Sequence, residues 1–508
     1  MATFFDCHDY QIALASLAAF FLLHLLRLSR RTPGSAPTRW PVIGMMPTVV
    51  RNISRIHDYI TQVLNEFGGT FTFRGPTFAR MDMLFTSDPA NIHHIFVRKF
   101  HNYPKGPDFR AIFDVLGDGI FSSDSALWEL HRRATLSLLN DDKFYALLEK
   151  TVWDKVRTGL GPVLDHFSRS GTEFDLQDVL QRFSFDNICR FFLDHDPGSL
   201  SVDLPDVPCE RALGDALEPL FYRHIVPKPI WKLQKWLVIG QERKLIESWK
   251  AFDDFIYKHI DTSSSHEGLN VFASFVKAYN EGREKGLCSS GNLRGFLRDT
   301  FLGLLFAGRD SLSVSLTWFF WLISRNPQVE EKIREEMEEI LKIKKGGEWR
   351  FFEMEECKGL VYLHAALCET LRLYPPIGLE LKYAAEEDFL PSGHRVRPGT
   401  RVVVSFYSTG RLGSVWGEDC GEFRPERWLV EPGRVRNEPP ARFPAFNVGP
   451  RSCPGKKMSF LEMKMVAAFM VHHFDVRAVA GQVVAPRNAI MLKARNGLRV
   501  RLTGKYRQ

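Results

Sequence analysis

Near its C-terminus, at residues 442–457, the chain carries the segment RFPAFNVGPRSCPGKK. A thiolate persists in a protein only where positive charge, backbone N–H groups or a metal favour it over the thiol. The two flanking glycines allow the backbone to turn tightly and to approach a bound group closely. The pattern favours a metal-bound thiolate over a buried free cysteine, which is the alternative. Five positions carry the spacing F-x-x-G-x-R-x-C-x-G, namely Phe446, Gly449, Arg451, Cys453 and Gly455.

The residues after Cys453 predict a helix from Lys456 to His473. Pro454 suits the first position of that helix, because the fixed φ of proline matches a helical start. Such a helix points its first N–H groups at the sulfur, where they stabilise a negative charge. The segment therefore predicts a thiolate loop that leads into a helix.

The segment resembles the haem-binding signature of the cytochrome P-450 monooxygenases. This resemblance implies the cytochrome P-450 fold, which is mainly α with a small β region, in a single large haem domain. It also implies heme b as the cofactor, with Cys453 as the metal ligand. Four neighbours are then expected to bind the cofactor: Phe446 shields the loop from water, Arg451 reaches a haem propionate, and Gly449 and Gly455 let the backbone approach the ring.

The composition excludes several classes of protein. With 508 residues, 44% of them hydrophobic, the chain is long enough for a large core. A net charge of +7 is spread along the chain without the concentrated basic stripe that nucleic-acid binding requires, so we expect no nucleic-acid partner. The eight cysteines form no C-x-x-C pair, which argues against a zinc site or a disulfide framework.

An apolar run from Tyr10 to Leu26 contains no Asp, Glu, Lys or Arg. Acidic residues precede it and basic residues follow it, so the positive-inside rule places its C-terminal side in the cytosol. We predict an N-terminal membrane anchor over residues 1–31 in the endoplasmic reticulum membrane; a cleaved signal peptide is the alternative. A proline-rich hinge is predicted over residues 32–48, because proline forbids a regular helix. Residues 49–508 are then the cytosolic haem-thiolate domain.

Trp128 and Arg132 stand four residues apart, on one face of a predicted helix. In the resembled family a W-x-x-x-R pair on this helix binds a haem propionate, and the planar fork of Arg suits a carboxylate. Lys382 stands about where many relatives hold a basic residue for the second propionate. We expect all three to bind the cofactor; an ordinary surface Trp/Arg pair is the alternative.

Residues 296–324 predict one long helix that ends before an Asn-Pro pair. Within it, residues 307–311 read A-G-R-D-S and resemble the family's A-G-x-D-T segment, where Gly308 leaves room for dioxygen. The resemblance implies that Asp310 and Ser311 are catalytic and relay protons to the iron-bound oxygen. Since Ser311 keeps the hydroxyl of the usual Thr but lacks its methyl, we expect a relay that works but is held less rigidly.

Glu369 and Arg372 form an E-x-x-R pair on a predicted helix, and Arg427 lies in the segment F-R-P-E-R-W. A solvated ion pair is the ordinary interpretation of such spacing. The resemblance instead implies a buried Glu–Arg–Arg cluster that braces the haem loop and has no catalytic role.

A narrower resemblance is to plant fatty-acid and alkane hydroxylases, closest to their mid-chain alkane hydroxylase family. It rests on the phrases F-A-G-R-D at 306–310, N-Y-P-K-G at 102–106, A-F-N-V-G-P-R at 445–451 and L-P-S-G at 390–393. It implies that one oxygen atom enters a C–H bond of a long-chain alkane, fatty acid or fatty alcohol. An apolar pocket would suit an alkyl chain and equally a sterol or terpene. The apolar residues expected to line it are Phe113, Val115, Leu116, Phe301, Leu304, Leu305, Ile377 and Leu379.

The region Leu217–Leu237 mixes large apolar residues with Lys and Arg. It is predicted either to dip into the membrane beside the entry to the site or to form a partly buried helix pair. No G-x-G-x-x-G follows a predicted strand, so we expect electrons from a separate NADPH–haemoprotein reductase. Its acidic surface would meet the lysines near the thiolate loop, which are Lys456, Lys457 and Lys464.

Three other functions remain open at this point. One is phenol coupling or hydroxylation of an alkaloid or terpenoid by a diverged member of the same plant group. The second is a haem-thiolate isomerase or dehydratase that needs neither O₂ nor a reductase. The third is a haem-binding membrane protein without activity. The pairing of Asp310 with Ser311 argues against the last two.

Overall fold

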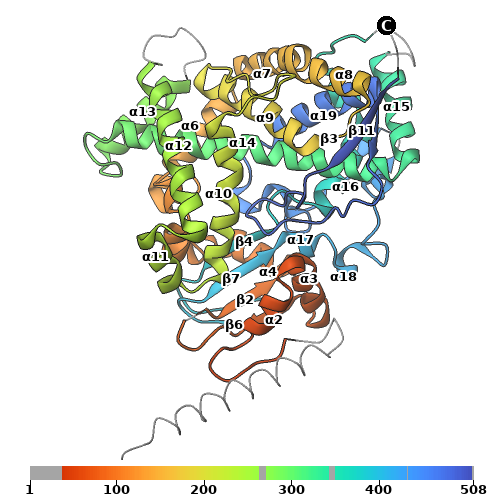
Figure 1. The fold of residues 1–508 in the computed structure, drawn as a ribbon. Helices are drawn as coiled ribbons and strands as arrows, with labels where there is room; N and C mark the ends of the chain where they lie inside the picture. The colour runs from red at the N-terminus through yellow and green to blue at the C-terminus, as the bar shows by residue number, and fades with distance from the viewer. Residues whose placement is uncertain (1–36, 80, 263–270, 343–348, 432, 506–508) are drawn as a thin grey trace, which may run out of the picture.

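The structure is a computed structural model that describes residues 37–79, 81–262, 271–342, 349–431 and 433–505. Helices make up most of it, and a small sheet region lies at the end of the molecule near α2 and α3 (Figure 1). The predicted anchor over residues 1–31 lies outside the described residues. Within the described part, no helix is long and apolar enough to cross a membrane.

The helices are α2 (Met46–Arg51), α3 (Ile56–Glu66), α4 (Pro89–His93), α5 (Gly106–Ile112), α6 (Ser125–Leu139), α7 (Asp142–Lys155), α8 (Gly161–Ser170), α9 (Leu176–Leu193), α10 (Pro208–Ile225), α11 (Lys228–Leu237), α12 (Gly240–Thr262), α13 (Val271–Glu284), α14 (Leu293–Ser324), α15 (Pro327–Leu341), α16 (Val361–Leu373), α17 (Phe406–Thr409), α18 (Gly413–Trp416) and α19 (Lys456–His473). The strands are β1 (Thr70–Phe73), β2 (Met83–Thr86), β3 (Phe174–Asp175), β4 (Leu379–Tyr383), β5 (Asp388–Phe389), β6 (Arg395–Val396), β7 (Arg401–Ser405), β8 (Leu429–Glu431), β9 (Arg434–Val435), β10 (Phe474–Ala478) and β11 (Arg499–Gly504).

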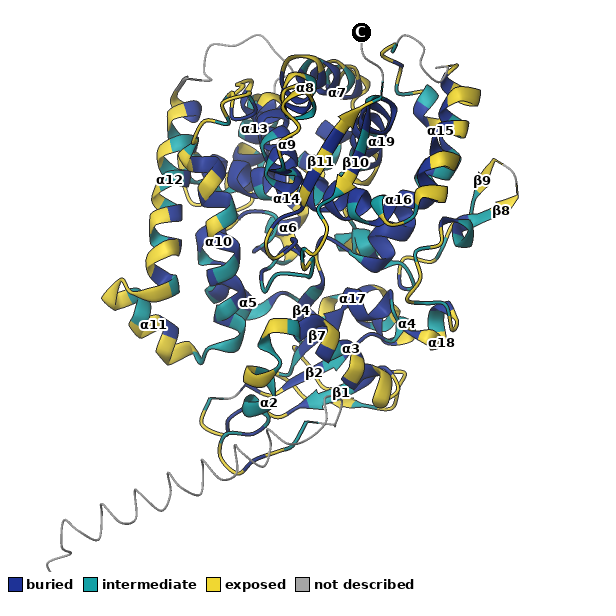
Figure 2. Cartoon of the chain, turned by 45° about the vertical axis from the view of Figure 1, so that its right-hand side comes forward, coloured by how far each residue is buried: buried dark blue, intermediate teal, exposed yellow. Residues whose placement is uncertain are grey.

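The long helix predicted over residues 296–324 is confirmed as α14, which runs across the middle of the molecule (Figure 1). It packs against α9, α12, α16 and α19. Both α14 and α9 are buried on nearly every face, whereas α11, α12 and α15 keep exposed outer faces (Figure 2). A helix that is apolar all round belongs in the core of a large protein, and α14 has that role.

The absence of a side chain at Gly308 allows α14 to lie close to α9. A Cβ atom at this position would overlap the side chain of Ile188 on α9. Gly308 also lines the central cavity, so the room it leaves is shared between the cavity and helix packing.

The main sheet has the strand order β1-β2-β7-β4, in which β2 and β7 are parallel and the other pairs are antiparallel. The alternating segment T-F-T-F at residues 70–73 forms β1, and residues 395–405 form β6 and β7 with a turn between them. A second sheet, β10-β11-β3, lies toward the opposite end of the molecule (Figure 1).

The predicted hinge extends too far. Helix α2 begins at Met46, inside the range 32–48 assigned to the hinge. Pro47 occupies the first turn of α2, where a missing N–H costs no hydrogen bond, so it starts the helix instead of preventing it. Upstream, Trp40 and Gly44 form an isolated β-bridge.

The predicted cluster around Glu369 is confirmed. Both side chains of the Glu369–Arg372 pair on α16 are fully buried, with bonds of 2.7 and 2.8 Å. Glu369 also accepts hydrogen bonds from Arg427 Nε at 3.3 Å and from Trp428 Nε1 at 2.9 Å. Arg372 donates in turn to the carbonyls of Cys420 and Glu422. The cluster therefore fixes α16 to the irregular segment that precedes residues 442–457.

Replacing Glu369 by Gln leaves the buried Arg372 guanidinium without a countercharge and leaves Arg427 with Asp419 alone, at 3.0 Å. Removing one partner of a buried pair costs about 3–5 kcal/mol, so we expect a loss of that order in the free energy of unfolding. Urea unfolding of the full chain in detergent measures it. Glu281→Gln is the matched control, because its pair with Arg133 is exposed and an exposed pair contributes about 0–1 kcal/mol. Equal losses in the two variants would contradict the bracing role.

Candidate active site

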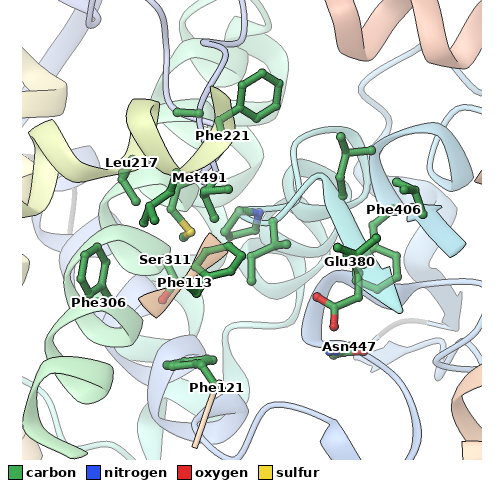
Figure 3. Close-up of a pocket in the computed structure, with 18 of the residues that line it drawn as sticks. Phe113, Phe121, Leu217, Phe221, Phe306, Ser311, Glu380, Phe406, Asn447 and Met491 are labelled. Carbon is green, nitrogen blue, oxygen red and sulfur yellow. The ribbon is translucent and has the colours of Figure 1, made fainter. Parts of the chain in front are cut away.

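A cavity of about 470 Å³ lies under α14, between α10, α19 and the main sheet, and continues to α2 and α3. Its walls are mostly apolar, and the side chains in Figure 3 surround the space from several elements. Residues labelled there are Phe113, Phe121, Leu217, Phe221, Phe306, Ser311, Glu380, Phe406, Asn447 and Met491.

Five of the predicted lining residues are confirmed and three are wrong. The cavity is lined by Phe113, Leu116, Leu304, Ile377 and Leu379. Three others pack into the hydrophobic core away from the cavity wall, and these are Val115, Phe301 and Leu305.

The thiol of Cys453 reaches the cavity from the loop before α19. The Cys453 backbone N–H donates to the Phe446 carbonyl at 2.7 Å and closes this loop. Gly449 has φ +66°, and a Cβ there would overlap the Phe96 carbonyl, so only glycine fits. The helix from Lys456 to His473 is confirmed as α19, but Pro454 is not its first residue. Gly455 is the N-cap, so the chain turns for two residues after the cysteine before the helix begins.

The protein by itself does not favour the thiolate. Burial raises the pKa of Cys453, and the Gly455 N–H, Arg132 and Lys456 oppose this rise only in part. A bound metal must supply the remaining stabilisation. Phe446 lines the cavity and packs on Phe460, with 5.1 Å between ring centroids, which keeps bulk water from this side of the loop.

Trp128, Arg132 and Arg451 meet at the wall beside Cys453. Arg132 donates to the Ser452 carbonyl at 2.8 Å, and Arg451 donates to Asp124 Oδ1 at 2.7 Å. The guanidinium carbons lie 5.8 and 4.6 Å from the centroid of the Trp128 ring. Because Arg451 Nε is buried without a hydrogen-bond partner among the described residues, one donor remains for a bound group.

Lys382 lies on β4 behind the same wall. Its Nζ is buried without a hydrogen bond in the described part of the chain, 3.8 Å from Glu380 Oε1. Burial, together with the nearby Lys105, lowers the pKa of Lys382 to about 7. Glu380 and Lys105 line the cavity and are joined by a 2.6 Å ion pair, and neither was predicted. The sequence did contain a signal for Glu380. Side chains two residues apart on a strand share a face, which puts Glu380 on the same face as Lys382.

These residues fit an iron porphyrin with two carboxylate side chains. Four cationic groups and two carboxylates gather in or directly behind the wall at one end of a mostly apolar cavity. An unpaired donor on Arg451 and another on Lys382 suit an added anion, since buried charges need partners. Gly455 has only the Cys453 sulfur within 4 Å of where a Cβ would lie, so the backbone beside the thiol is open to a bound group. The cationic groups are Lys105, Arg132, Lys382 and Arg451, and the carboxylates are Asp124 and Glu380.

Asp310 and Ser311 point in different directions. Ser311 lines the cavity, and its Oγ donates to the Ala307 carbonyl at 2.6 Å. Asp310 is fully buried on the far side of α14, where Oδ1 accepts from Arg309 at 2.6 Å and lies 2.8 Å from Lys493 Nζ. Its Oδ2 has no partner among the described residues. The ion pairs with Arg309 and Lys493 were not predicted, because Arg309 occupies the variable position of the A-G-x-D-T pattern.

Residues 33–498 match the family model for Cytochrome P450. The chain belongs to this family. The P450 is 39% identical to Alkane hydroxylase MAH1 of Arabidopsis thaliana over 96% of this chain and 98% of that protein. It is 38% identical to Noroxomaritidine synthase 1 of Narcissus pseudonarcissus, over 97% and 95% of the two chains. It is also 38% identical to Cytochrome P450 86B1 of Arabidopsis thaliana, over 99% and 91%.

Membership of the family defines the chemistry at a coarse level. The P450 is a haem-dependent oxidoreductase, and its family holds the haem iron through a cysteine thiolate. Its monooxygenase reaction uses O₂ and electrons from a redox partner.

Of the three lysines predicted to meet a reductase, the prediction is wrong for one. Lys464 is buried, and its Nζ donates to the Cys357 carbonyl at 2.6 Å. Lys456 and Lys457 are exposed at the start of α19, so these two remain available to an acidic surface. Lys464 lies two turns beyond Lys457 and therefore on the same face of α19, but there the segment around Cys357 covers that face.

Glu462, one turn beyond Met458 on α19, is a carboxyl group in the cavity wall that the sequence did not indicate. It is 4% exposed and has no hydrogen bond or ion pair in the described part of the chain. Burial raises the pKa of Glu462 to about 8, so the folded P450 holds this group protonated at neutral pH.

Replacing Glu462 by Gln removes a pH-dependent cost. The unfolded chain ionises Glu near pH 4.5 and the fold only near pH 8, so the wild type loses stability as pH rises through this window. The variant has no such loss. We expect the variant and the wild type to have equal thermal midpoints at pH 5. At pH 8.5 the variant unfolds at a higher temperature, and its free energy of unfolding is larger by on the order of 4 kcal/mol at most. Glu338→Gln, on the exposed face of α15, is the control. An unchanged difference across pH would contradict the assignment.

Proposed function

We propose that the protein is a haem-thiolate monooxygenase of the endoplasmic reticulum membrane that hydroxylates long-chain aliphatic lipids, at a mid-chain or terminal carbon. The shape and lining of the cavity carry this proposal. It reaches from Cys453, before α19, to Met45, Met46 and Val49 beside the main sheet, with apolar side chains along nearly the whole path. A flexible alkyl chain fills such an extended apolar space with little unpaired polar surface.

In this proposal Cys453 binds the haem iron, and the haem supplies the activation of O₂. Arg132 and Arg451 bind one propionate beside Trp128, and Lys382 with Lys105 binds the other. Phe446, Gly449 and Gly455 shape the loop that carries this ligand.

We assign the proton relay to Ser311 and Asp310. Ser311 Oγ lies in the cavity and passes on a proton, and Asp310 connects that position to the buried cations. Burial lowers the pKa of Lys493 to about 8, so Lys493 exchanges protons at physiological pH. Because the two side chains lie on different sides of α14, a water or a rotation of Ser311 has to join them.

The exposed face of α11 supports a membrane location. Ile230, Leu233 and Trp236 are 48%, 53% and 78% exposed, and lysines interleave them on the same short helix. An amphipathic helix of this kind lies in the interfacial layer of a membrane. Since α10 lines the cavity immediately before α11, lipid would enter beside this helix. The anchor over residues 1–31 and an NADPH–haemoprotein reductase that meets Lys456 and Lys457 belong to the same proposal.

The relatives are compatible with two substrate classes. One is named an alkane hydroxylase, and another, at nearly equal identity, is named Noroxomaritidine synthase. The second candidate function is therefore oxidation of a plant specialised metabolite, including phenol coupling of an alkaloid. A reductase-independent isomerase is the third, and the buried Asp310 cluster beside Ser311 counts against it.

A microsomal assay with NADPH and a plant reductase tests the proposal. The panel contains long-chain alkanes, primary alcohols, free fatty acids and phenolic alkaloid precursors, and mass spectrometry identifies the products. We expect hydroxylated aliphatic products that require NADPH. Coupled phenols without aliphatic products would replace the lipid assignment by the alkaloid one, and turnover without NADPH would favour the isomerase.

Cys453→Ser tests the ligand. A serine oxygen does not provide the thiolate that shifts the reduced-CO band to the red, so we expect that band to disappear and monooxygenation to fall below detection. Haem content, measured separately, distinguishes a changed ligand from lost cofactor. Cys420→Ser, at a half-buried cysteine outside the cavity, is the control. A band that persists in the Cys453 variant would show that another residue is the ligand.

A further inference from the structure

One face of α10 forms the roof of the cavity. The side chains on this face recur at helical spacing, and one of them is polar. The other positions on this face are apolar and are stabilised by burial. A histidine among them loses hydration of its ring nitrogens, which is unfavourable unless they gain a hydrogen-bond partner. The lining residues of α10 are Leu217, Leu220, Phe221, His224 and Ile225.

The ring nitrogens of His224 remain available to a ligand. His224 makes no hydrogen bond within the described residues, and its nitrogens are not sealed by neighbouring atoms. His57 lines the same cavity but differs, because both of its nitrogens are covered. Of these two histidines, only His224 is placed to bind a molecule in the cavity.

The position of His224 is fixed by its neighbour in sequence. Arg223 donates to Glu242 at 2.6 and 2.7 Å, to the Ile112 carbonyl at 2.6 Å and to Asp114 at 2.8 Å. These bonds join the end of α10 to α12 and to the segment after α5. The His224 ring then lies edge-on to Phe113, with 5.7 Å between centroids, at the cavity wall. A side chain held in this way is preorganised for binding.

His224 is electrically neutral in the cavity. Burial, and secondarily the charge of Arg401, lowers the pKa of His224 to about 4. A neutral imidazole has one donor and one acceptor nitrogen, which matches an uncharged hydroxyl group. A fatty-acid carboxylate would have to be desolvated beside this uncharged ring, and the nearby Arg401 already has a carboxylate, Asp108, 4.0 Å away.

We propose that His224 hydrogen-bonds a hydroxyl group of the aliphatic substrate and makes the enzyme prefer a long-chain alcohol to the unsubstituted alkane and to the carboxylate. The inference rests on the proposed function, because it assumes an aliphatic substrate in this cavity. It assigns His224 as the residue that recognises oxygen already present on the chain. The reaction that supplies the substrate is then one that reduces an acyl group or hydroxylates an alkane.

Substrate-binding shifts in the haem spectrum of the holoenzyme test the assignment. The probes are hexadecane, 1-hexadecanol and hexadecanoate, and the variants are His224→Phe and His224→Gln. In the wild type we expect Kd for the alcohol to be about tenfold lower than for the alkane. The Phe variant keeps an aromatic ring but no hydrogen bond, so its Kd for the alcohol rises about tenfold while that for the alkane stays constant. The Gln variant keeps a donor and an acceptor and retains most of the preference.

The outcomes separate the two levels of inference. An alcohol-to-alkane ratio that is the same in wild type and His224→Phe overturns the role of His224 and leaves the proposed function standing. Tighter binding of hexadecanoate than of the alcohol by the wild type also overturns it. Absence of a spectral shift with all three probes, in protein with a normal reduced-CO band, overturns the aliphatic substrate class and the His224 assignment together.

Discussion

The buried carboxylate of Glu369 is the interaction on which the architecture of the site depends. It accepts hydrogen bonds from Arg372, Arg427 and Trp428, in a place where no water can replace a lost partner. Through Arg372 the same cluster reaches the carbonyls of an irregular segment that a helix or sheet does not organise. The loop that carries Cys453 follows this segment, and Trp428 of the cluster contacts Phe443 at the start of that loop with 4.7 Å between ring centroids, so the cluster supports the loop.

The cavity has a charged part and an apolar part, and these suit two different ligands. Cations and carboxylates gather at the wall around Arg132, Arg451 and Lys382, whereas the path toward α2 is almost entirely apolar. A group with acidic side chains is stable only at the first end, and a hydrocarbon chain only in the second part. The two ligands are therefore directed to different places by solvation, before any specific contact is considered.

Much of the fold and part of the site could be predicted from sequence. The helix after Cys453 and the long helix through Gly308 follow from periodicity and capping rules, which are local properties. The Glu369 cluster was implied by the resemblance to the family, because its spacing alone indicates a solvated ion pair. Properties that depend on packing could not be predicted. The spacing alone does not reveal that Asp310 faces away from the cavity or that Lys464 is buried, because both depend on which neighbour covers each helix face.

The contact between Gly308 and Ile188 has a consequence for redesign of the enzyme. A Cβ atom at residue 308 would overlap Cδ1 and Cγ1 of Ile188, so the Ile188 side chain must shift or shrink, or α14 must move away from α9. Because the two residues are in contact, the effects of substitutions at 308 and 188 on stability are not expected to add. Reshaping the cavity wall at this point therefore favours paired substitutions that conserve the combined volume, such as Ala at 308 with Ala at 188.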